Sequence, residues 1–123
     1  MTGCVGTGPS RFYVQDSNIV GPREEEAPQY ELIVDEPGFE SWMVTNARPI
    51  GFYTKSYYET KNRIYVSDWN DKVTAFRHRR RSPFTEIINY DFTIDYGIEL
   101  NYKLFYYFKF MHQKYGRRYT FPN

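Results

Sequence analysis

Cysteine and long apolar runs are what this 123-residue sequence has least of. Its single cysteine, Cys4, excludes an internal disulfide and any zinc site built on several cysteines. No run of about eighteen apolar residues occurs, so no segment of the given sequence is predicted to cross a membrane as a helix.

Signals for catalysis are also sparse. The sequence contains two histidines, of which His78 is flanked by arginines that repel a metal ion, and His112 follows a run of aromatic residues. No G-x-S-x-G motif supports a hydrolase triad. The glycines of the first eight residues do not lie between a strand and a helix, as a phosphate-binding loop requires. We therefore expect no enzymatic activity, no metal site and no cofactor.

The carboxylates of the second half suggest structure more than chemistry. Asp68, Asp71, Asp91, Asp95 and Glu99 could be paired for acid–base catalysis only in a fold that the sequence does not itself indicate. We interpret them as helix caps and as members of solvated helix faces.

Aromatic residues are what the sequence has in abundance. Phe, Trp and Tyr make up 20% of the chain, with thirteen tyrosines and ten phenylalanines, whereas leucine is scarce. Tyrosine combines an apolar ring with a polar hydroxyl, so the predicted core is amphipathic and some rings remain partly exposed. The length suits one domain. We predict a small α+β domain over residues 29–123, with two main helices, a short helix and a few short strands.

In the first half, alternating apolar residues predict a strand over residues 29–34. The Asp-Glu-Pro-Gly sequence at 35–38 predicts a tight turn, and a short helix is expected over residues 39–47. Ser56 and Glu59 have the spacing of a capping box, from which a long amphipathic helix extends to Phe76. The alternative in this region is a strand over the β-rich residues 63–67.

In the second half, residues 85–94 are predicted to form a strand or an extended connection. Asp95 can cap the last helix, whose apolar face includes Leu100, Leu104 and Met111. Gly116 stands where helices often end in a left-handed residue. Residues 119–121 are predicted to return as an edge strand.

The first four residues, Met-Thr-Gly-Cys, resemble the end of a bacterial lipoprotein signal, in which a lone cysteine follows small residues and receives acyl chains. The alternative is an N-terminal cysteine without a role. Residues 5–28 are rich in Gly, Pro, Ser, Asn and Glu, so residues 1–28 are predicted to be a lipobox remnant and a flexible tether. Cys4 is therefore predicted to attach the protein to a membrane of the bacterial cell envelope, with the outer membrane favoured.

Charge is unevenly distributed along the chain. Residues 1–50 contain three basic and eight acidic residues, for a net charge of −5, whereas residues 51–123 contain thirteen and seven, for +6. The simplest interpretation is mutual neutralisation on folding. The run Arg77, Arg79, Arg80 and Arg81 is the best local candidate for an anionic partner, because guanidinium groups bind phosphates bidentately. A solvated helix end has the same pattern. Nucleic acid is not a favoured partner, and a phosphate-bearing lipid headgroup or an acidic protein is about as compatible with the run.

Several segments rich in aromatic, Asn and Asp residues resemble a small family of uncharacterised envelope lipoproteins of the Bacteroidota. The resemblance covers roughly residues 29–116 and is carried by residues 30–42, 56–70, 94–104, 106–110 and 114–116. It implies a signal peptide ahead of Cys4, export and lipidation, and it carries over no catalytic residue.

These observations together predict a membrane-anchored envelope lipoprotein that acts as a non-enzymatic binding or accessory component of a protein assembly. Its expected partners are the membrane, through a lipidated Cys4, and a protein of the envelope. The alternative is a nucleic-acid or phosphate-binding module centred on Arg77 to Arg81.

Overall fold

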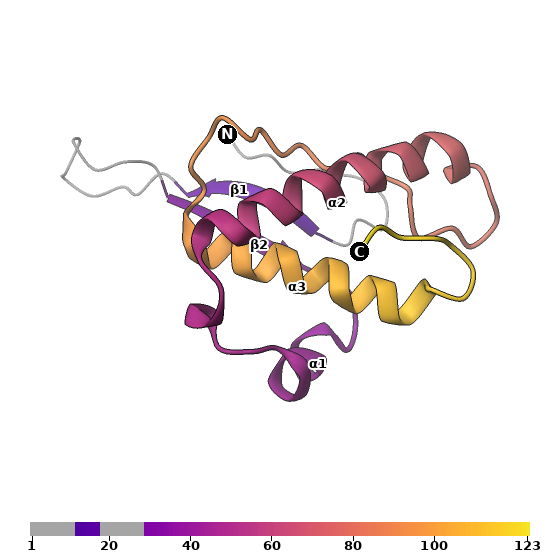
Figure 1. Ribbon diagram of the computed structural model, residues 1–123. Helices are drawn as coiled ribbons and strands as arrows, with labels where there is room; N and C mark the ends of the chain where they lie inside the picture. Colours follow the sequence, from indigo (N-terminus) through magenta and orange to yellow (C-terminus); the bar gives the residue numbers. More distant parts are fainter. Residues whose placement is uncertain (1–11, 18–28) are drawn as a thin grey trace.

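A computed structural model describes residues 12–17 and 29–123 of the chain (Figure 1). Two strands precede three α-helices and a short 3-10 helix. In chain order they are β1 (Phe12–Ser17), β2 (Gln29–Val34), α1 (Phe39–Asn46), the 3-10 helix η1 (Ile50–Phe52), α2 (Lys55–Phe76) and α3 (Gly97–Tyr115). This is the small mixed α+β domain that the sequence predicts.

The two long helices lie side by side and run in the same direction (Figure 1). Ring contacts follow in parallel order along them, because Tyr58 packs on Tyr102, Tyr65 on Phe108 and Phe76 on Tyr119 just beyond α3. The C-terminal ends of both helices therefore lie at the same end of the molecule. The connection over residues 77–96 travels back along α2 to the start of α3.

The N-cap of α2 lies two residues before the predicted capping box. The helix begins at Lys55, and the Thr54 hydroxyl, not that of Ser56, accepts a hydrogen bond from the Tyr57 N–H at 3.1 Å. Thr54 is in an extended conformation, which lets its side chain reach back over the first turn. The helix then continues through residues 63–67, so the alternative strand there is wrong.

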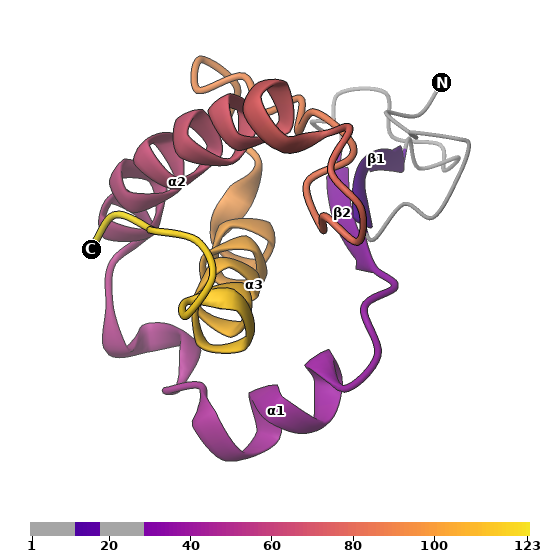
Figure 2. The same cartoon turned by 90° about the vertical axis from the view of Figure 1, so that its right-hand side faces the viewer.

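Helix α3 lies in the middle of the domain, with the other elements around it (Figure 2). The predicted apolar face is buried, and Leu104 and Met111 are fully so. Tyr106 and Phe110 are buried as well, because Trp42 of α1 packs on both rings. Phe105 is buried against Tyr58 and Tyr65 of α2. A helix that is covered on most sides needs apolar residues around most of its circumference.

Strand β2 occupies the predicted residues and runs alongside α3. It pairs with β1 in antiparallel register, Phe12 opposite Val34 and Ser17 opposite Gln29. Residues 12–17 fall within the segment that the sequence predicts to be a tether, so the structure adds a paired strand there. The remaining tether residues, 1–11 and 18–28, lie outside the described part of the chain.

The turn after β2 agrees with prediction. The Phe39 N–H donates to the Glu36 carbonyl at 3.3 Å, and Gly38 between them has φ +87°, which a residue with a side chain rarely adopts. The predicted left-handed end of α3 is wrong, because Gly116 has φ −64°.

Two predicted strands are not formed. Residues 85–94 are the extended connection offered as the alternative. Their backbone groups bond to α2 side chains: Trp69 donates to the Glu86 carbonyl, and Asn70 both donates to and accepts from Ile88. Residues 119–121 instead place rings on the core, with Tyr119 on Phe84 at 4.8 Å between centroids.

Candidate functional site: a basic end

The predicted arginine run lies just beyond α2. Arg77 ends the helix, with its N–H bonded to the Val73 carbonyl, and all four side chains of Arg77, Arg79, Arg80 and Arg81 are exposed. The chain turns sharply here, since the Arg79 N–H donates to the Phe76 carbonyl at 2.9 Å and Arg81 has φ +63°. Because the helix has ended, the four arginine side chains extend into solvent and do not lie along one helix face.

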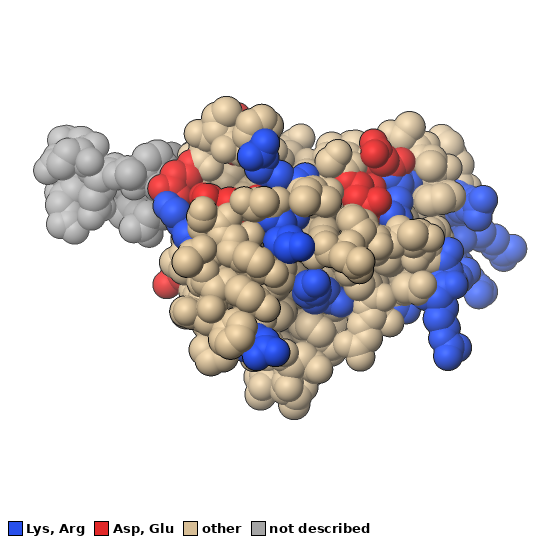
Figure 3. Space-filling view, in the orientation of Figure 1, with Lys and Arg blue, Asp and Glu red and all other residues tan. Residues whose placement is uncertain are grey.

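Two further arginines join this run in space. Arg117 and Arg118 follow α3, whose C-terminal end lies beside that of α2, and both are exposed. Tyr119 holds the two segments together, because its ring packs against Phe76 at 5.2 Å. We call the six arginines Arg77, Arg79, Arg80, Arg81, Arg117 and Arg118 the basic end. Figure 3 shows Lys and Arg gathered over this end of the molecule.

The positive charge of the basic end is larger than the negative charge that the helix ends place beside it. Two helix C-termini provide roughly half a negative charge each, against six guanidinium groups. Among the described residues, no carboxylate forms an ion pair with any of the six. Arg79 lies over the Phe76 ring at 4.9 Å, a contact that leaves its charge exposed. A strong surplus of positive charge remains available to a partner.

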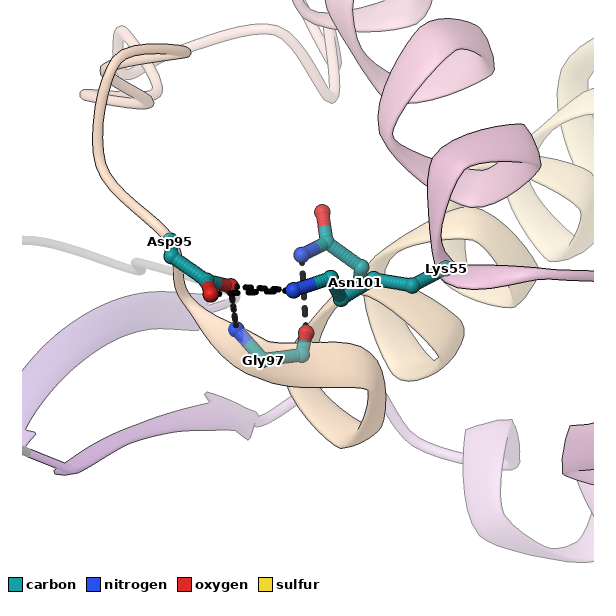
Figure 4. A network of polar contacts seen from close by, with 4 residues as sticks. All are labelled: Lys55, Asp95, Gly97 and Asn101. Atoms are coloured by element: carbon teal, nitrogen blue, oxygen red, sulfur yellow. Dashed lines mark hydrogen bonds and ion pairs between the residues drawn. The ribbon is translucent and has the colours of Figure 1, made fainter.

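The opposite end of the helix pair uses its charges internally (Figure 4). The Lys55 ammonium lies 2.9 Å from Asp95, and the same carboxylate accepts the Gly97 N–H at 3.0 Å. The Lys55 hydrogen bond and then that from Gly97 hold the pKa of Asp95 below its ordinary value. The N-cap residue of α3 is Tyr96, which makes no side-chain cap hydrogen bond, so the prediction that Asp95 is the cap is wrong by one residue. Asp95 instead accepts the first N–H of the helix from the position before the cap.

Other predicted carboxylates are also accounted for by structure. Asp68 pairs with Lys72 one turn along α2 at 2.6 Å. Asp91 accepts hydrogen bonds from the N–H and hydroxyl of Thr93, which lower the pKa of its carboxyl group. Asp71 and Glu99 are exposed. Within the described residues, no group of three or more His, Cys, Asp or Glu is arranged to hold a metal ion.

The two histidines lie in different surroundings. His78 is exposed within the basic end. His112 is half-buried, stacked on Phe121 at 4.4 Å and edge-on to Tyr65 at 5.2 Å. Burial, and then the nearby charges of Lys109 and Lys72, lower the pKa of His112 to about 4. The ring is therefore neutral at neutral pH and serves as part of the aromatic packing.

A second surface feature is a shallow groove of about 810 Å³ between the outer face of α2 and the returning connection. Ile64 and Phe92 line it and remain 46% and 62% exposed. Arg63 lies over the Phe92 ring at 4.5 Å, and Asp68 adds a carboxylate to the wall. The sequence does not indicate this groove, because Phe92 and α2 are brought together only by the path of the connection.

Cys4, the predicted lipid attachment site, lies outside the described residues. Among the helices that the structure describes, none has the length and apolar composition needed to cross a membrane.

Comparison with known proteins identifies the class to which this domain belongs. Residues 4–120 match a family of unknown function, DUF6146. The match covers nearly the whole sequence, so the chain belongs to the DUF6146 family. No curated protein and no solved structure matches the chain.

Proposed function

We propose that this DUF6146 protein is a non-enzymatic binding component of the bacterial cell envelope, held at a membrane by acyl chains on Cys4. The observation that carries the proposal is the basic end, where six exposed arginines from two segments meet without a carboxylate partner among the described residues. Such an arrangement suits an anionic surface, because guanidinium groups bind phosphate and carboxylate oxygens through paired hydrogen bonds.

The protein partner of an envelope assembly would contact the groove beside α2. Ile64 and Phe92 expose apolar surface there, and Arg63 and Asp71 provide charges of both signs at its walls. Apolar anchors within a polar rim are typical of surfaces that bind other proteins.

Nucleic acid remains the alternative partner of the basic end, and the packing argues against it. Binding to single strands usually relies on aromatic rings on which the bases stack. The two rings that join the arginine segments, Phe76 and Tyr119, pack on each other and on Phe84. Phosphate contact without base stacking is therefore the chemistry that this end offers.

Lipid attachment is tested by expressing the protein with its own upstream sequence in a bacterial host and separating detergent from aqueous phases. We expect the wild-type protein in the detergent phase and Cys4→Ser in the aqueous phase, because acyl chains dominate the affinity for a bilayer. Ser10→Ala is the matched control and should partition as wild type. Equal partitioning of wild type and Cys4→Ser would overturn the proposed anchor.

A further inference from the structure

We infer that the basic end faces the headgroups of the same membrane that holds Cys4, so that the anionic partner of the six arginines is the phosphate surface of a bilayer. This inference rests on the proposed lipidation of Cys4. It adds an orientation for the domain and a second contact with the membrane.

The direction of the sheet relates the anchor to the basic end. Strand β2 runs in the same direction as α3, because Tyr30 packs on Tyr96 before the helix and Glu36 pairs with Lys114 near its end. Phe12 lies opposite Val34 in the antiparallel pair. Strand β1 therefore begins at the end of the sheet that is nearer to the arginines.

The chain length between anchor and domain limits how far the domain can stand from the bilayer. Phe12 follows Cys4 by eight residues, which reach at most about 29 Å when fully extended. That upper limit is close to the length of α3, whose nineteen residues extend for about 28 Å. The domain is thus held near the headgroups, at a distance from which the basic end can reach them.

The distribution of charge then determines which end of the domain faces the bilayer. The basic end carries six arginines, whereas Asp91 and Glu99 are exposed around the start of α3 at the opposite end, where Lys55 neutralises Asp95. An anionic bilayer attracts the first end and repels the second. Because unpaired surface charges are screened beyond about 10 Å, the attraction is strongest when the arginines lie directly on the headgroups.

The first experiment isolates the arginine contact from the anchor. Unlipidated Cys4→Ser protein is titrated with vesicles of phosphatidylcholine alone or with phosphatidylglycerol added, at low ionic strength. We expect binding only to the anionic vesicles. Replacing Arg79, Arg80 and Arg81 with alanine should weaken it about 100-fold, because each cation near an anionic surface strengthens binding about fivefold.

A matched control variant removes the same number of positive charges from a different part of the surface. Replacing Arg48, Lys61 and Lys103 with alanine removes three exposed or half-exposed cations away from the basic end, and should weaken binding less than about threefold. Equal losses in the two triple variants would show a dependence on net charge alone and would overturn the inference. So would tighter binding to an oligonucleotide, or to an acidic protein, than to anionic vesicles at roughly 150 mM salt.

The second experiment measures orientation in the lipidated protein. Acylation occupies the Cys4 thiol, so a cysteine introduced by Arg80→Cys or by Glu99→Cys carries a fluorescent label at one known end. A quencher attached to lipid headgroups should quench the label at position 80 and leave that at position 99 bright. Equal quenching would overturn the inference. Because this result is read only in protein that partitions with detergent through Cys4, it fails separately from the proposed anchor.

Discussion

The two ends of the α2–α3 pair differ in whether their polar side chains bond within the domain or extend into solvent. At the N-terminal end, Lys55, Asp95, Gly97 and Asn101 form contacts within the domain (Figure 4). At the C-terminal end, six arginines extend into solvent and none has a carboxylate partner among the described residues. The comparison indicates that the first end stabilises the fold, and that the second is available for binding.

The difference is sharpest at Asn101, which is fully buried behind the N-terminal end. Its side-chain carbonyl accepts hydrogen bonds from the Tyr90 hydroxyl at 2.6 Å and from the Asn62 amide at 3.1 Å, and its own amide donates to the Gly97 carbonyl. One side chain thus joins α2, α3 and the connection between them. Burial of such groups is costly once their partners are removed.

The largest predicted effect tests this contrast directly. Asn101→Ala should lower the free energy of unfolding by about 2–3 kcal/mol, because Tyr90 and Asn62 lose a buried acceptor. Arg80→Ala at the other end should change it by less than about 0.5 kcal/mol. Urea denaturation of both variants measures the difference. Similar losses in the two would contradict the division of roles between the ends.

A smaller effect is expected at His112, close to the basic end. Its pKa is about 4 in the folded protein against 6.5 for an ordinary histidine, so the unfolded chain binds an extra proton between these values. Stability should therefore fall as the pH decreases from 6.5 towards 4. For this half-buried ring we expect a loss of about 1–2 kcal/mol after allowance for solvent screening.

The measurement for His112 is urea unfolding at about pH 7 and about pH 4.5, in wild type and in His112→Gln. The variant should lose most of the additional destabilisation at low pH, because glutamine does not titrate. His78→Gln, at an exposed position of the basic end, is the control and should retain the wild-type profile. An unchanged profile in His112→Gln would show that other groups cause the acid sensitivity.

The smallest predicted effect is at the glycine that starts α3. Gly97 has φ +89°, which a side chain disfavours, so Gly97→Ala should cost about 1 kcal/mol. Gly51 lacks a positive φ, and an added Cβ there would meet no atom within 4 Å, so Gly51→Ala should be neutral or slightly stabilising. The thermal unfolding temperatures of the two variants test these predictions. A neutral Gly97→Ala would show that this end tolerates backbone change.

Local sequence patterns predicted the elements that depend on local contacts. The strand over residues 29–34, the short helix after the turn and both long helices follow from periodicity and turn residues. The errors lie where partners from elsewhere compete. Residues 85–94 have the composition of a strand, but Asn70 and Trp69 take up several of their backbone groups. Strand β1 depends on a neighbour, and its own residues gave too weak a signal.

The sequence by itself determined the aromatic core, the places of the helices and the arginine run over residues 77–81. Only the tertiary structure decided that Arg117 and Arg118 join that run. A short loop after α2 would have made α3 antiparallel, as in helical hairpins, and would have put these arginines at opposite ends. The connection over residues 77–96 is long enough to return along α2, so the two helices run in parallel. Their C-terminal ends, and with them all six arginines, therefore meet at one end of the molecule.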